Sequence, residues 1–363
     1  MKKAERDKMD QTYGLFKFKV PSKEEQNSAL SLAGESTVLK KIITTEIDRF
    51  YDQVTTPEVG DWLMERKEFG QTYLEYLNSG IVPVKNERDI IYLTPLSYGE
   101  NVNIDQGFVT GLLFICEAYF YGMKVKVLDK KLDLNNYSIE IKMNADTNKI
   151  QFSSNEILTI LGKEIPQDAY CLIAFTDQDL FNDPDPYSKK DRSQGQGQMD
   201  STSFNFCYGL SNIKKRVGVF SFARYDPLFY VKNLKSDSEK QQEKLMKYFF
   251  ILFKRACKVM VKEITHMFGI KNCIFYSCNL NGFNSMEEYD RRPLELCPVC
   301  LRKLYSNLGM KSKQGLHSRI SNPYMLFDRF VKMKDSLNEN FPGIFEPEIV
   351  WYSARIDSIK NEI

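Results

Sequence analysis

The amino-acid sequence predicts an α/β fold, in the broad sense that includes α+β, and two observations favour it. From about residue 88, short runs of β-branched and aromatic residues alternate with longer segments of helical character, as in a sheet whose strands are joined by crossover helices. Hydrophobic residues account for 42% of the 363 residues and aromatic residues for 13%, which is ample for a sizeable core. We therefore expect either two domains or one large domain with extensions.

The N-terminal part of the chain, residues 1–87, is predicted to be an extension with one or two helices. Residues 1–37 are polar and rich in charge, which indicates an arm or a loosely packed segment. A shorter helix is expected over 58–69, after Pro57. Apolar residues at helical spacing predict a first helix over 38–54: Leu39, Ile42, Ile43, Ile47 and Phe50.

The central region, residues 88–310, contains the alternating elements. A helix is expected to begin at the capping-box residues Ser153 and Glu156 and to end near Leu161. The stretch 182–202 is rich in Pro, Gly, Gln and Ser and is expected to be a flexible surface insertion. Two further helices are predicted at 105–121 and 238–268, and four strands at 89–93, 123–128, 170–175 and 217–222.

The C-terminal part, residues 311–363, is predicted to be a helical tail. An amphipathic pattern over 324–337 indicates one helix, whereas the stretch after it contains two prolines and little regular pattern. The tail either packs back on the central region or docks onto a partner protein, and the sequence leaves both open.

Composition and charge exclude several classes of function. The 50 Lys and Arg residues balance the 48 Asp and Glu residues to a net charge of +2, so no nucleic-acid or anionic-membrane partner is expected. The longest apolar runs, 109–116 and 248–253, fall far short of the ~20 residues that span a bilayer. No signal peptide is recognisable, and we expect a cytoplasmic protein, with an organelle or a cytoskeletal assembly left open.

Four of the eight cysteines gather in the segment 273–300 as Cys273, Cys278, Cys297 and Cys300. Two thiolates two residues apart can bind one small cation, and a second pair completes the tetrahedral sulfur shell of a closed structural zinc site. Such a site has no open coordination position, so it would stabilise the fold without catalysis. A redox pair of Cys297 and Cys300 is the alternative, but it leaves the other two without a role. The remaining cysteines are expected to be small buried hydrophobic residues: Cys116, Cys171, Cys207 and Cys257.

The segment that leads into the first of these cysteines has the spacing of a metallopeptidase helix. In the pattern H-E-x-x-H-x-x-G-x-x-H, two histidines one turn apart bind zinc, the glutamate acts as a base, and a third histidine follows a glycine turn. Here the three ligand positions hold Lys262, His266 and Asn272, with Glu263 at the position of the base and Gly269 at the turn.

This helix together with the four cysteines resembles the archaemetzincins, a family of metzincin-like zinc peptidases. The resemblance covers roughly residues 88–308. It implies a metzincin-like fold, with a twisted mixed sheet, an active-site helix beneath it and a second zinc ion on the four cysteines. It also implies that Glu263 corresponds to the general base and His266 to the second ligand of the catalytic zinc. The similar segments are 117–129, 168–181, 216–230 and 282–304.

Two ligand positions depart from the family pattern and predict that the catalytic zinc is absent. Lys262 is cationic at neutral pH unless its pKa is strongly perturbed, and Asn272 offers only an amide oxygen, a poor zinc donor beside imidazole. The other histidine of the chain is His317, so three imidazoles cannot be assembled. We expect one zinc ion per chain, with the Lys262 ammonium in the place of the catalytic zinc. There it would balance Glu263 and hydrogen-bond toward His266 or Asn272.

The sequence leaves two functions open. The first is a catalytically inactive relative, a zinc-stabilised scaffold that binds a protein partner within a larger assembly through the former substrate cleft, the 182–202 stretch or the terminal extensions. The second is an active zinc metallopeptidase, aminopeptidase-like, whose zinc is completed by another residue such as His317 or a loop Asp or Glu.

Overall fold

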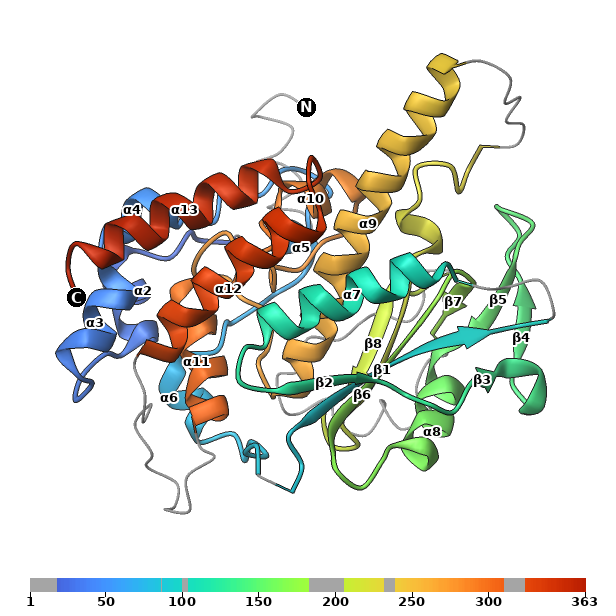
Figure 1. The fold of residues 1–363 in the computed structure, drawn as a ribbon, viewed down its shortest axis with the longest axis horizontal. Helices are drawn as coiled ribbons and strands as arrows, with labels where there is room; N and C mark the ends of the chain where they lie inside the picture. Colours follow the sequence, from blue (N-terminus) through green and yellow to red (C-terminus); the bar gives the residue numbers. More distant parts are fainter. Residues whose placement is uncertain (1–17, 86, 100–103, 183–205, 232–238, 310–323) are drawn as a thin grey trace, which may run out of the picture.

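The fold is seen in a computed structural model. Figure 1 shows a twisted sheet with helices on both of its faces and the N- and C-terminal helices side by side at one end. The predicted α/β fold with a mixed sheet is confirmed. The structure describes residues 18–85, 87–99, 104–182, 206–231, 239–309 and 324–363.

The main sheet has six strands in the order β2-β1-β6-β9-β8, with β3 paired to β1. Its strands run parallel except β8, which lies antiparallel to β9. The four predicted strands are β1, β2, β6 and β9, whereas the edge strand β8 and the shorter strands are not foreseen by the sequence pattern. The bounds are β1 Ile90–Ser97, β2 Lys124–Val127, β3 Leu132–Asp133, β6 Ala169–Thr176, β8 Gly209–Asn212 and β9 Val217–Ser221. A second sheet joins β4 Ile141–Met143, β5 Ile150–Ser153 and β7 Asp179–Phe181.

The main sheet separates two hydrophobic cores. In β1, Ile91 and Leu93 belong to the larger core, whereas Ile90 and Tyr92 belong to the smaller one. This follows from the geometry of a strand, in which successive side chains point to opposite faces. Because both faces are covered, the central strands read as continuous apolar runs, which is why the sequence predicts them well.

Three helices cover these faces, and all three are predicted by the sequence. The larger core is covered by α7 (Gln106–Tyr119) and α9 (Glu239–Met267), and the smaller core by α8 (Ser154–Glu164). The Ser153 side chain accepts a hydrogen bond from the backbone N–H of Glu156, so the predicted start of α8 is confirmed.

The prediction of a loose N-terminal arm is wrong for the part of it that the structure describes. Helix α2 (Lys23–Leu30) opens on a capping box between Ser22 and Glu25, and it buries Ala29 completely. Residues 1–17 lie outside the described part of the chain, as do residues 183–202 of the predicted insertion.

The helix predicted over 38–54 is two helices, α3 (Thr37–Thr44) and α4 (Ile47–Phe50). Between them, Arg355 from the C-terminal end of the chain donates to the backbone carbonyls of Ile42 and Ile43 at 2.7 and 3.1 Å. A distant side chain thus takes the carbonyls at the end of α3. The helix predicted over 58–69 shortens to α5, Trp62–Glu65, and is followed by α6, Tyr73–Leu77.

The C-terminal tail packs on the rest of the molecule, so the first of the two alternatives for it is confirmed. Helix α12 (Tyr324–Asn340) contacts α7, α3 and α13 (Glu346–Lys360). Helix α13 corrects the prediction that the stretch after α12 has little regular structure. Pro347 lies in its first turn, where a proline costs no intrahelical hydrogen bond.

Fully buried arginines join both terminal extensions to the central region. Arg302 of α11 (Pro298–Gly309) donates to the backbone carbonyls of Leu30 and Ser31 and forms an ion pair with Glu35 at 2.7 Å. These contacts complete the end of α2.

In the described part of the chain, none of the helices has the length and apolar character needed to cross a membrane.

Candidate metal centre and the degenerate active-site helix

The four cysteines predicted to bind zinc meet in space. Their sulfur atoms all lie within 4.8 Å of one another, and the Cys273 and Cys297 sulfur atoms are 3.5 Å apart. Zinc–sulfur bonds of ~2.3 Å in a tetrahedron would place neighbouring sulfur atoms ~3.8 Å apart. The backbone N–H groups of Leu280 and Cys297 donate to the Cys278 sulfur at 3.5 and 3.3 Å, an arrangement that stabilises a thiolate. The cluster could therefore hold a zinc ion in a closed four-sulfur site.

The redox alternative for this cluster finds no support in its geometry. All eight cysteines are free thiols and all are buried, whereas a reactive thiol needs access to solvent. Hydrogen bonds from the neighbouring thiols, that of Cys278 first, hold the pKa of Cys273 well below its ordinary value. Burial confirms the expectation for the four outlying cysteines: Cys116, Cys171, Cys207 and Cys257.

Helix α9 carries the metallopeptidase-like motif and ends as the sequence predicts. Gly269 adopts a φ of +84°, the left-handed region, and its N–H donates to the His266 carbonyl at 2.8 Å. The chain then turns back so that the Ile270 carbonyl lies 2.7 Å from Nδ1 of His266. Since a carbonyl only accepts, Nδ1 carries the proton and Nε2 keeps a lone pair. Burial lowers the pKa of His266, so this imidazole is a competent neutral donor.

Lys262, at the first ligand position, turns its amine to the backbone. Its Nζ donates to the carbonyl of Asn281 at 3.1 Å and lies 5.2 Å from the centre of the Phe283 ring. The expected hydrogen bond toward His266 or Asn272 is therefore not the one that forms. Burial, reinforced by the nearby Arg292 cation, lowers the pKa of Lys262 to about 7. Near neutral pH the amine is therefore only partly protonated, which is the perturbed case that the sequence left open.

Glu263, at the position of the base, lies between α9 and the edge strand β8. Its carboxylate accepts a hydrogen bond from the Ser211 hydroxyl. Gly209 makes room for it, since a Cβ at that position would stand 3.1 Å from a carboxylate oxygen. Sequence reasoning missed both β8 residues, because a strand of four residues at the sheet edge gives no periodic signal.

Asn272, at the third ligand position, is engaged by a residue that the sequence does not single out. Its side-chain N–H donates to a carboxylate oxygen of Glu68 at 2.8 Å, and the indole N–H of Trp62 donates to the same oxygen at 2.9 Å. The negative charge of Glu68 also acts on Lys262 and His266, raising the pKa of each against the effect of burial. Glu68 therefore acts on all three ligand positions, on Asn272 through a hydrogen bond and on Lys262 and His266 through its charge.

Glu68 belongs to residues 58–72 of the N-terminal extension, which we call the strap. The Trp62 ring packs on Gly282 so closely that a Cβ there would stand 2.2 Å from it. The Trp62 backbone N–H donates to Glu288 at 2.9 Å, and Gln71 donates to the Gly269 carbonyl at 3.2 Å. The strap is therefore fastened to the end of α9 and to the cysteine-bearing loop.

These contacts allow a test of whether the motif positions fit a catalytic zinc. They provide one imidazole lone pair, an amine bonded to a carbonyl and an amide whose N–H is used by Glu68. That is not the set of three donors that a catalytic zinc requires. Among the described residues, the cysteine cluster is the one group of three or more His, Cys, Asp or Glu residues with ligand atoms close enough for a metal. His317 lies outside the described residues.

Comparisons with known proteins identify the family. The family model of Peptidase family M54 matches residues 231–306. Archaemetzincin-2 of Homo sapiens is 31% identical over 291 residues, which are 76% of this chain and 75% of that protein. The chain belongs to the archaemetzincin family. Archaemetzincin-2 of Pongo abelii is 30% identical over 77% of this chain and 76% of that protein.

Two solved archaemetzincin structures are also similar to this chain. The crystal structure of archaemetzincin from Archaeoglobus fulgidus, complexed with malonate, has 22% identity and a TM-score of 0.37, covering 59% of this chain and 99% of that one. Archaemetzincin from Methanopyrus kandleri has 18% identity and a TM-score of 0.40, covering 62% of this chain and 99% of that one.

Proposed function

We propose that this archaemetzincin is a catalytically inactive member of its family, which binds one structural zinc ion through Cys273, Cys278, Cys297 and Cys300 and acts as a protein-binding scaffold. The observation that carries the proposal is the network at the three ligand positions. An amide oxygen is a poor zinc donor beside imidazole, and the Lys262 amine and the Asn272 amide are turned toward the Asn281 carbonyl and the Glu68 carboxylate instead of toward a shared metal position. Without a metal ion, Glu263 has no bound water to activate.

A zinc count on protein purified under zinc-replete conditions tests the proposal. The wild type is expected to hold one tightly bound ion, and the double variant Lys262→His/Asn272→His to gain a second, since it restores three imidazoles around the existing His266. Two ions in the wild type would overturn the proposal. If the double variant gains none, loss of the two imidazoles is not by itself the cause.

Peptide hydrolysis provides the second readout. Wild type and Glu263→Gln are expected to give the same background rate, because the carboxylate has no catalytic partner. The double variant gives the matched positive comparison, and any activity in it should disappear on the further change Glu263→Gln. A wild-type activity that Glu263→Gln abolishes would establish an enzyme.

The alternative function, an active peptidase with an atypical zinc, is favoured by one observation. Glu68 brings a loop carboxylate to a site where His266 retains a free Nε2 lone pair. If these two residues held a metal with further help, Glu68→Gln would remove a zinc ion and the activity together. The inactive scaffold instead retains its single zinc in that variant.

A protein partner is supported by apolar side chains on the first half of α9, which projects beyond the sheet in Figure 1. Met246 is 57% exposed and Phe249 44% exposed; residues three apart share one face of a helix, and neighbouring exposed apolar side chains can mark a protein-binding surface. We expect the native assembly, in a cytoplasmic extract, to exceed the mass of one chain and to shrink in Phe249→Glu. Val350→Glu, at a residue that is 67% exposed on α13, is the control. If the wild-type protein in the extract has the native mass of a single chain, the scaffold role is contradicted.

A further inference from the structure

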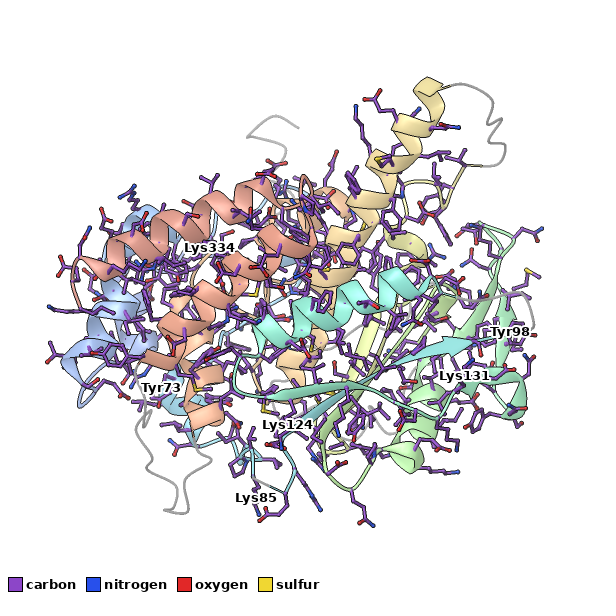
Figure 2. The ribbon with its side chains drawn as sticks, viewed as in Figure 1. Tyr73, Lys85, Tyr98, Lys124, Lys131 and Lys334 are labelled. Atoms are coloured by element: carbon purple, nitrogen blue, oxygen red, sulfur yellow. The ribbon has the colours of Figure 1, made fainter. Side chains whose placement is uncertain are left out.

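A second site, independent of the cysteine cluster and of α9, lies where the strands of the main sheet begin. Here a cavity of about 320 Å³ is lined by side chains from the loop before β1, the start of β6 and the β8–β9 hairpin. Three of the lining residues are basic, Lys85, Arg88 and Arg216, and one is acidic, Glu87. Figure 2 labels Lys85 and, nearby, Lys124 of β2 at this end of the molecule.

Arg216 is held in place by the backbone. It occupies the left-handed region with a φ of +57° at the end of the hairpin turn, and its N–H donates to the Asn212 carbonyl at 2.8 Å. Its Nη1 donates to the carbonyls of Ala169 and Tyr170 at 3.0 and 2.6 Å. The remaining N–H groups of this guanidinium have no partner among the residues that the structure describes, so they are available to a ligand.

The three basic side chains line the cavity together with a single carboxylate, that of Glu87. No ion pair joins Lys85, Arg88 or Arg216 to a carboxylate anywhere in the described ranges, although the same chain pairs many of its other lysines and arginines. Burial and then the charge of Arg88 lower the pKa of Arg216, as expected where two cations lie close together. Three cations and Glu87 leave a local charge of +2 (3 − 1) in a chain whose total is +2.

We propose that this cavity binds the phosphate group of a small phosphorylated molecule. Guanidinium groups present paired N–H donors that match phosphate oxygens, and an ammonium adds a point charge. A phosphate monoester carries about −2 near neutral pH, which matches the local charge. One carboxylate would leave half of that charge without a counter-charge. The site is unrelated to the catalytic positions of the family, and its test is independent of the zinc count.

Calorimetric titration of the zinc-loaded full chain with inorganic phosphate tests the proposal, against sodium acetate at the same ionic strength. Saturable one-to-one binding of phosphate is expected, with acetate at least ~10-fold weaker, since acetate has only two oxygens and one negative charge, so charge-assisted hydrogen bonds to a third oxygen are lost. Arg88→Gln and Arg216→Gln should each weaken phosphate binding ~10-fold or more. Lys124→Gln removes an exposed lysine at the same end of the sheet that pairs with Asp89, and it should leave the affinity within about twofold.

Arg216→Gln also removes hydrogen bonds to the backbone and could be unstable for that reason. In that case Arg88→Gln, at an exposed residue, is the variant that tests the proposal. Glycerol 3-phosphate and vesicles containing phosphatidic acid then distinguish a soluble ligand from a lipid headgroup. Equal binding of phosphate and acetate, or phosphate binding unchanged in Arg88→Gln, would overturn the proposal. Binding of an acidic peptide without competition by phosphate would overturn it as well.

Discussion

At the scale of single residues, Lys262 shows how a buried amine behaves at a position where the metallopeptidase pattern has a histidine. The lysine is not simply a cation in the place of zinc. It is buried, its Nζ bonds to the Asn281 carbonyl, and its pKa falls to about 7. The negative charges of Glu263 and Glu68 oppose that fall but do not cancel it. The site therefore balances charge partly by releasing a proton rather than by forming one strong ion pair.

The lowered pKa of Lys262 predicts a pH dependence of stability. In the unfolded chain the amine has an ordinary pKa near 10.4, so between about pH 7 and pH 10 the unfolded state binds more protons than the folded state. The free energy of unfolding then rises with pH across this window. The cost of burying the charged amine is fully present below pH 7.

Urea unfolding of the zinc-loaded protein at pH 6 and pH 9 measures this effect. Replacing the lysine in Lys262→Met should remove on the order of 2 kcal/mol of the rise between the two pH values. Lys258→Met is the comparison, because burial lowers the pKa of Lys258 to about 8 and its share of the rise should be smaller. An identical pH dependence in wild type and Lys262→Met would show that the amine stays charged in the folded protein.

At the scale of elements, the end of α9 depends on a single backbone conformation. Gly269 has a φ of +84°, and a Cβ there would meet the Ile81 side chain at 3.1 Å. Gly269→Ala should therefore lower the free energy of unfolding by about 1–2 kcal/mol. Gly162→Ala, inside α8 with only ordinary contact to a flexible lysine, should instead be neutral or raise it by up to ~1 kcal/mol.

Thermal and urea unfolding of both glycine variants measure this contrast. A gain or no change in Gly269→Ala would mean that the turn after α9 is not rigid. The turn would then not fix the position of Asn272, and the position of the strap on α9 would have to be set by its other contacts.

At the scale of the whole molecule, the sequence predicts what is local and misses what is distant. Strands β1, β2, β6 and β9, the long helix α9 and the cysteine cluster follow from patterns along the chain and are found, whereas the edge strand β8 is not foreseen. Asn272 and Glu68 are separated by 204 residues, and no periodicity connects them. In the same way, α3 ends where it does because of Arg355, more than 300 residues away.

The structure of the tail is a further case of distant control. The two prolines after α12 discourage a helix prediction, yet one of them, Pro347, lies in the first turn of α13. What stabilises α13 is a buried cluster in which Glu295 accepts from Arg329 and from the Tyr352 hydroxyl. Glu295 lies two residues before Cys297, and its backbone carbonyl accepts a hydrogen bond from the Asn279 N–H at 3.1 Å, so the polar network of the tail extends to the segment that carries the cysteine cluster.

That shared network predicts that disturbing the tail destabilises the metal centre. Arg329 is fully buried, donates to the Tyr119 carbonyl at 3.0 Å and pairs with Glu295 at 2.5 Å. Arg329→Met would leave the Glu295 carboxylate buried without its cation, at a cost of ~3–5 kcal/mol. Arg49→Met, which breaks an exposed ion pair with Glu46, should cost under ~1 kcal/mol.

The rate at which zinc is released to a chelator shows whether the tail and the cysteine cluster unfold together or separately. It can be followed with a chromogenic reagent for thiols or with a metal indicator. If the tail and the cluster unfold as one unit, Arg329→Met should accelerate zinc release in proportion to its loss of stability, while Arg49→Met releases zinc at the wild-type rate. Conversely, removing zinc from the wild type should expose the tail helices to protease together with the cysteine loop. Zinc release that is unchanged in a destabilised Arg329→Met would show that α12 and α13 unfold separately, and that the cysteine cluster stabilises only its own loop.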